Sequence, residues 1–76
     1  GLVDFTGKRV IDVGAGTGRL AFTAAPLARV VYAVEPVGNL RETLREKARR
    51  RGFSHFYAVD GLITAIPFED GFADVI

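Results

Sequence analysis

The sequence predicts an α/β fold built on a parallel sheet, and three observations support that prediction. A strand rich in β-branched residues, at 8–13, runs directly into a turn with glycine at three alternate positions. Two further apolar segments, at 30–35 and 55–59, end at or next to an acidic residue. Segments with helical periodicity separate the strands. This alternation is typical of parallel sheets with right-handed crossovers.

Each expected element is bounded by residues that favour its ends. The first strand is apolar enough to be buried on both faces, as a central parallel strand would be. Pro26 ends the first helix, because proline removes a donor and pushes the preceding residue out of helical geometry. Asn39 and Glu42 are typical of an N-terminal capping pair, and Gly52 stops that second helix. The expected elements are strands at 8–13, 30–35, 55–59 and from about 72, helices at 17–25 and 39–51, and a short segment at 62–66.

Both helices are expected on one face of the sheet, because the first three strands step in one direction. The fourth strand returns to the far side of the first, which gives the strand order 3-2-1-4 in a Rossmann-like arrangement of two or three layers. The connection before that strand can cover little of the other face, so self-association through the uncovered face or edge is expected. The packed helix positions are expected at Leu20, Ala21, Ala24 and Ala25, and at Leu40, Leu44 and Ala48.

Composition narrows the class of protein. The chain has 76 residues, 49% of them hydrophobic and 25% charged, which predicts a single globular domain over residues 1–76. It contains no cysteine, which excludes disulfides and cysteine metal sites, and we expect no metal site. No apolar run reaches membrane-spanning length and no signal peptide is visible, so we expect no membrane partner and a cytoplasmic protein.

Basic residues are concentrated in the second helix. Residues 41–51 carry six basic and two acidic side chains. Arginines in a last turn favour the negative helix end and are solvated, and we therefore expect no nucleic acid as a partner.

Polar residues follow the strands at one edge of the predicted sheet. Ligands of open α/β sheets bind at the carboxyl ends of the strands, where glycine lets the backbone turn sharply and a ligand approach closely. Asp12 is costly to bury alone, so we expect it to accept hydrogen bonds from amides of its own turn, to shape the polar end of a cofactor, or to do both. Glu35 fits a carboxylate that binds two ribose hydroxyls. The residues at this edge are Asp12, Gly14, Gly16, Gly18, Glu35 and Asp60.

The residues alone leave the ligand open. A dinucleotide fold has G-x-G-x-x-G, and Arg19 occupies the place of its third glycine here. A phosphate loop is excluded, since no Gly-Lys-Ser/Thr follows. The Glu35 carboxylate argues against 2′-phosphorylated nucleotides as ligands, but it does not distinguish among the remaining nucleotide cofactors. An NAD- or FAD-binding oxidoreductase domain stays an alternative, and so does a non-catalytic module that keeps the fold for binding.

Four segments resemble the motifs of class I S-adenosylmethionine-dependent methyltransferases. Residues 10–18 (VIDVGAGTG) resemble the first motif, Val34-Glu35-Pro36 the end of the second strand, and Val59-Asp60-Gly61 the third-strand motif. Residues 66–76 resemble the run into the fourth strand of the small-molecule branch called type 11. Val37 departs from the pattern, because the family often has a capping serine or aspartate there. The resemblance implies the N-terminal, cofactor-binding part of a larger methyltransferase domain.

The resemblance also implies roles for single residues. Gly14 and Gly16 would approach the methionine part of S-adenosylmethionine, and Glu35 would bind the ribose hydroxyls. Asp60 would meet the adenine amino group, and Leu62 would pack on the adenine ring. The implied acceptor is a small molecule; no catalytic residue is named, and the chain alone is expected to bind weakly without turnover. The expected cofactor-binding residues are Asp12, Gly14, Ala15, Gly16, Gly18, Glu35, Pro36, Asp60, Gly61 and Leu62.

Overall fold

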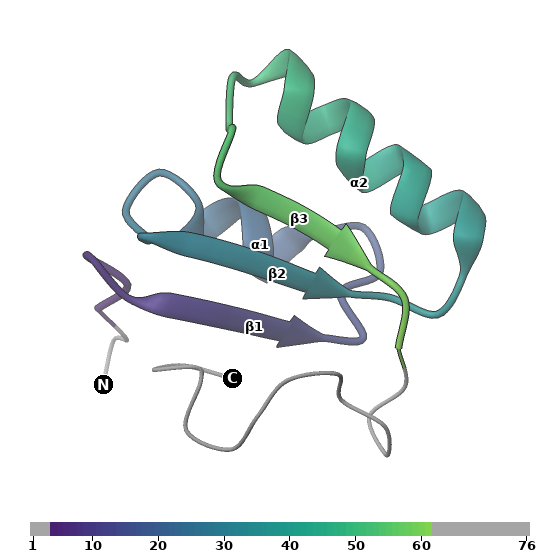
Figure 1. Ribbon diagram of the computed structural model, residues 1–76, viewed down its shortest axis with the longest axis horizontal. Coiled ribbons are helices and arrows are strands. Elements are labelled where there is room, and N and C mark those ends of the chain that lie inside the picture. Colours follow the sequence, from purple (N-terminus) through teal and green to yellow (C-terminus); the bar gives the residue numbers. More distant parts are fainter. Residues whose placement is uncertain (1–3, 62–76) are drawn as a thin grey trace.

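A three-stranded parallel sheet forms the centre of the computed structural model, which describes residues 4–61 (Figure 1). The strands are β1 (Arg9–Val13), β2 (Val30–Val34) and β3 (Phe56–Val59), and they lie in the order β1-β2-β3. All three arrows end at the same edge in Figure 1. The predicted parallel α/β fold is confirmed. The predicted fourth strand, and with it the full order 3-2-1-4, lies outside the described residues.

Two helices, α1 (Arg19–Ala24) and α2 (Gly38–Arg50), cover one face of this sheet. Successive side chains of a strand point to opposite faces, so the residues that share a core with the helices define the covered face. Those strand residues alternate, and the register places them side by side. The prediction that both helices lie on one face is confirmed. The shared core includes Val10, Val31, Ala33, Phe56 and Ala58 from the sheet and Ala21, Phe22, Ala24, Leu44 and Ala48 from the helices.

The packed face of α1 differs from the prediction at one residue. Leu20 is 43% exposed, whereas Ala21, Phe22 and Ala24 are buried. The helix has only six residues, and the side that these three residues share faces the sheet. Leu20 lies off that side, so its predicted place in the core is wrong.

The start of α2 also differs. The predicted capping pair is wrong, because the helix begins at Gly38 and its N-cap residue, Val37, makes no side-chain cap. Asn39 lies inside the helix, and the Glu42 carboxylate instead accepts a hydrogen bond from Arg45.

The end of α2 agrees with the prediction. The Gly52 N–H donates to the Arg49 carbonyl at 3.1 Å, and the Phe53 N–H donates to the Ala48 carbonyl at 3.0 Å. These two bonds form the Schellman arrangement that satisfies the last carbonyls of a helix.

The sheet face away from the helices carries two tyrosines. Tyr32 and Tyr57 are paired in the register and stack with ring centroids 5.4 Å apart. Tyr57 is 49% exposed. Self-association through this face stays a prediction.

Candidate functional site

The glycine turn joins β1 to α1 and is fixed to the end of β2. Gly14, Gly16 and Gly18 have φ angles of +69°, +58° and +85°, in the left-handed region that L side chains rarely adopt. The N–H groups of Gly14 and Ala15 both donate to the Val34 carbonyl, at 2.8 and 3.1 Å. The turn therefore has one fixed position at the carboxyl edge of the sheet.

The glycines of this turn serve two different sides. A Cβ atom at Gly18 would lie 2.5 Å from a methyl carbon of Leu44 and 2.7 Å from the Phe22 ring. Among residues 4–61, the nearest atom to a Cβ at Gly16 would be the Gly14 carbonyl oxygen, at 3.9 Å, and a Cβ at Gly14 would have no neighbour within 4 Å. Gly18 thus allows α2 to pack against the turn, which is the close-packing role of the third glycine in dinucleotide folds. Gly14 and Gly16 leave open space.

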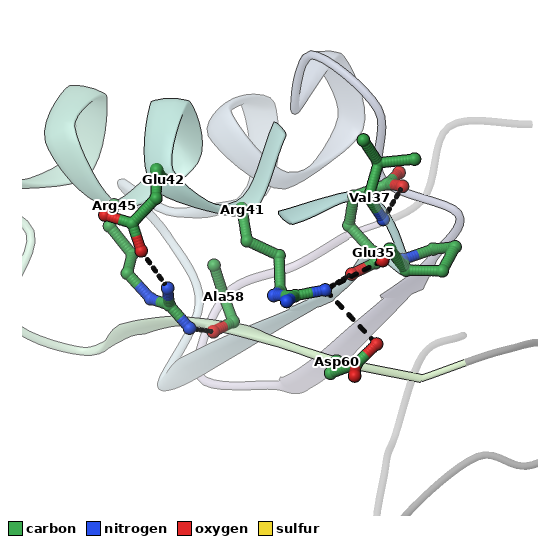
Figure 2. A network of polar contacts seen from close by, with 8 residues as sticks. Glu35, Val37, Arg41, Glu42, Arg45, Ala58 and Asp60 are labelled. Atoms are coloured by element: carbon green, nitrogen blue, oxygen red, sulfur yellow. Dashed lines mark hydrogen bonds and ion pairs between the residues drawn. The ribbon is translucent and has the colours of Figure 1, made fainter. Parts of the chain in front are cut away.

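Glu35 connects the glycine turn to the start of α2. Its side chain is buried, and Oε1 accepts a hydrogen bond from the Gly16 N–H at 2.8 Å. Oε2 accepts a hydrogen bond from the Val37 N–H at 2.9 Å (Figure 2). The carboxylate has about four lone-pair positions, so two amides leave capacity for further donors. The sequence predicted the ligand-binding role of Glu35 and missed this second, structural one.

Asp12 lies at the same edge but on the helix side of the sheet. It is buried and pairs in the register with Ala33, which belongs to the core under the helices. Burial raises the pKa of its carboxyl group, an amide hydrogen bond from Ala21 opposes that rise, and the charge of Glu35 adds to it. Ala21 is the third residue of α1, where the N–H has no partner within the helix. The amide that Asp12 contacts therefore belongs to α1, not to its own glycine turn as one interpretation had it.

Arg41 ties the β2–α2 turn to the end of β3. Its Nη1 atom donates to the carbonyls of Glu35 and Pro36, at 3.0 and 2.9 Å. The same atom lies 3.2 Å from Oδ1 of Asp60, and Figure 2 shows the three contacts converging. The Asp60 side chain is 73% exposed, and its contact with Arg41 holds the carboxylate in place at the open edge. Sequence reasoning missed Arg41, although a basic residue in the first turn opposes the helix dipole and was a usable signal.

The other predicted residues divide among several places. Ala15 packs against the core, and Gly61 follows Asp60 as the last described residue. Leu62 lies outside the described residues. His55 precedes β3, and its Nε2 atom lies 2.7 Å from the Ala25 carbonyl, which gives it a structural partner away from the site. The structure thus gathers Asp12, Gly14, Gly16, Glu35, Pro36 and Asp60 near one edge.

Two features are absent from residues 4–61. This part of the chain holds no group of three or more His, Cys, Asp or Glu side chains arranged to bind a metal ion. It also holds no helix that combines the length and the apolar character needed to cross a membrane.

Comparisons with known proteins agree with this geometry. The family described as methyltransferase domain matches residues 11–76. A curated relative, protein-L-isoaspartate O-methyltransferase 2 of Marinobacter nauticus, is 34% identical over 67 residues, which are 82% of this chain and 31% of that protein.

Several solved structures of similar fold share more than a quarter of their aligned residues with this chain, and two of them serve as examples. The YcgJ protein of Bacillus subtilis has a TM-score of 0.84 and 26% identity, over 90% of this chain and 30% of that one. A coclaurine N-methyltransferase bound to N-methylheliamine and SAH has a TM-score of 0.72 and 28% identity, over 92% and 20%. The chain thus spans about a third or less of these proteins. With the motif order, the parallel sheet and the glycine turn, the family match shows that this chain belongs to the class I S-adenosylmethionine-dependent methyltransferases.

Proposed function

We propose that this protein binds S-adenosylmethionine at the carboxyl ends of β1, β2 and β3 and serves methyl transfer to a small-molecule acceptor. The observation that carries the proposal is the contact between Glu35 and Gly16, because it places a buried carboxylate beside an open glycine turn. The chain covers only part of the length of its relatives, so methyl transfer by the whole protein is likewise proposed.

The residues at this edge fit the cofactor part by part. Within the described part of the chain, no atom lies closer than 3.9 Å to a Cβ built on Gly14 or Gly16, which leaves room for the methionine part against the backbone. Glu35 keeps unused lone pairs for the two ribose hydroxyls. Asp60 offers a fixed, exposed carboxylate to the adenine amino group. Leu62, expected on the adenine ring, is two residues after Asp60 in the sequence.

The chain acts by binding and orientation. When bound, S-adenosylmethionine supplies an electrophilic methyl group on a sulfonium sulfur. Methyl transfer depends chiefly on alignment of the two reactants, which can contribute about 7–11 kcal/mol of the barrier in well-oriented reactions. The glycine turn, held by Val34 and Glu35, provides a fixed seat for that alignment. We assign no general base among residues 4–61.

Calorimetric titration with S-adenosylhomocysteine and with NAD, in parallel, tests the proposal. S-adenosylhomocysteine is expected to bind and NAD is not. Glu35→Ala is expected to weaken binding by about 1.5–3 kcal/mol, the range for hydrogen bonds to charged groups. Glu42→Ala is the matched control, because it removes an exposed carboxylate from the adjacent helix.

A ribose analogue separates direct contact from loosening of the turn. The unaltered protein is expected to bind the 2′-deoxy analogue of S-adenosylhomocysteine less tightly than the parent compound. The Glu35→Ala protein is expected to bind the two compounds equally tightly. An equal loss for the analogue in both proteins would contradict the diol contact. Preference for NAD would refute the cofactor assignment itself.

A further inference from the structure

We propose that a surface pocket between α1 and α2 binds the phosphate group of a small anionic molecule. The pocket has a volume of about 340 Å³, and three of the residues that line it are cationic: Arg19, Lys47 and Arg51. Phe22 also lines the pocket, and neither Glu35 nor Asp60 does. Gly18 of the glycine turn also lines it, so the pocket lies beside that turn and away from Glu35 and Asp60, and its ligand does not depend on the proposed methyl transfer.

The structure divides the basic residues of the second helix into two sets. One set is paired, because each member lies within ion-pair distance of a carboxylate. Lys47 and Arg51 form the other set, since no carboxylate within residues 4–61 lies at that distance from either. Both of these residues line the pocket. The paired residues are Arg41 with Asp60, Arg45 with Glu42, and Arg49 and Arg50 with Glu46.

Lys47 and Arg51 converge on a single aromatic ring. The Lys47 Nζ atom lies 5.2 Å from the centre of the Phe22 ring, and the Arg51 Cζ atom lies 4.9 Å from it. Lys47 also donates to the Thr17 carbonyl at 3.3 Å, which fixes its position further. Cation–π contacts and a carbonyl hold these charges without neutralising them. A bound anion would remove the mutual repulsion of the three cations.

The chemistry of the lining favours phosphate. A guanidinium group matches two phosphate oxygens at once, and a lysine ammonium adds a point charge. No carboxylate lines the pocket to compete for these donors. A second hollow of about 280 Å³ shares Lys47 and Arg51 and leaves room for the rest of a small molecule. The cations line two adjoining hollows of limited volume, which fit a single phosphate-bearing molecule better than a nucleic-acid strand.

Titration of the ¹⁵N-labelled protein with inorganic phosphate tests the proposal. Sodium chloride at equal ionic strength is the reference, because exposed charges respond to salt alone. We expect the amide signals of Gly18, Phe22, Lys47 and Arg51 to shift saturably with phosphate, and to show at most small shifts that do not saturate with chloride. Shifts that rise linearly without saturation would overturn the proposal.

Three variants separate a built site from bulk charge. Lys47→Gln and Arg51→Gln are each expected to weaken phosphate binding about tenfold, as loss of one charged hydrogen bond does. Arg49→Gln removes the same charge from the same end of α2 but outside the pocket, and is expected to change affinity less than about twofold. Equal weakening in all three variants would overturn the proposal.

Two further arms keep the test decisive. Lys47→Arg keeps the charge and is expected to retain binding, so it carries the test if Lys47→Gln fails to fold. A single-stranded oligonucleotide is the other probe. Tighter binding of the oligonucleotide than of phosphate, weakened as much by Arg49→Gln as by Arg51→Gln, would show that the surface contacts an extended nucleic-acid backbone. That result would refute the compact phosphate site.

Discussion

The two sides of the glycine turn differ sharply although they are only two residues apart. On the core side, a Cβ at Gly18 would meet Leu44 at 2.5 Å. On the open side, the one atom of residues 4–61 within 4 Å of a Cβ at Gly16 would be the Gly14 carbonyl oxygen, at 3.9 Å. Both residues have positive φ, so backbone conformation alone does not separate them. The difference shows that one glycine is required for packing and the other for space.

A carboxylate supports each side of this turn. Glu35 accepts a hydrogen bond from Gly16 on the open side, and Asp12 accepts one from Ala21 of α1 on the core side. Both carboxylates are buried. Substitutions on the core side are therefore tested by stability, whereas substitutions on the open side are tested by both stability and ligand affinity.

Gly18→Ala is expected to have the largest effect on stability. Overpacking against Leu44 and Phe22, with left-handed strain, is expected to lower the free energy of unfolding by about 3–5 kcal/mol. Stability of about 0.05–0.15 kcal/mol per residue leaves a domain this small little margin. Urea denaturation followed by circular dichroism measures the loss. A Gly18→Ala protein as stable as the unaltered chain would contradict the packing role.

Glu35→Ala is expected to come next. It leaves the amides of Gly16 and Val37 without their charged acceptor, and a loss of about 2–3 kcal/mol in unfolding free energy follows. Glu35→Gln keeps one amide acceptor and is expected to lose less. Denaturation of the two variants side by side measures the difference. If both are as stable as the unaltered chain, Glu35 does not hold the turn.

Gly16→Ala is expected to separate the two sides most clearly. Left-handed strain alone costs about 1–2 kcal/mol, because the new Cβ meets no close neighbour. We expect this folded variant to lose at least about tenfold in S-adenosylhomocysteine affinity, since the methyl group occupies the space left for the ligand. The larger Gly16→Val is expected to abolish binding. Calorimetry on either variant with normal affinity would place the ligand elsewhere.

The sequence predicted the local parts of this arrangement better than the long-range ones. The glycine turn and the acidic strand ends were predicted because their signals lie within a few residues of one another. The contact of Gly18 with Leu44 was not, because it joins elements whose packing no local pattern encodes. The capping pair failed for a related reason. The carboxylate near the start of α2 comes from Glu35, which precedes the helix and also reaches back to Gly16.

The basic run of the second helix shows the same limit. Its charge was visible in the sequence, and its interpretation as a solvated helix end fits Arg49 and Arg50, which pair with Glu46 on the exposed surface. Spacing did not show that Lys47 and Arg51 turn toward Phe22 of α1. That information lies in the packing of the two helices.

Asp12→Asn is expected to have the smallest effect, and one that depends on pH. The pKa of Asp12 is raised in the folded protein above its usual value of 3.8, mainly by burial. Between the unfolded and folded pKa values the folded state binds more protons, so this group's contribution to stability falls as pH rises. Above the folded pKa the charged carboxylate is a constant cost. Asp12→Asn removes the cost, so its unfolding free energy relative to the unaltered chain is expected to rise from pH 3.8 upward and then level off.

Asp4→Asn provides the control for that measurement. The Thr6 N–H donates to the Asp4 carboxylate at 2.9 Å, and this backbone hydrogen bond lowers the pKa of Asp4. The unfolding free energy of Asp4→Asn relative to the unaltered chain is therefore expected to fall as pH rises, over a pH range below 3.8. Urea denaturation at several pH values gives both curves. A flat difference for Asp12→Asn would mean that the Ala21 amide hydrogen bond fully offsets burial, and the raised pKa of Asp12 would then be refuted.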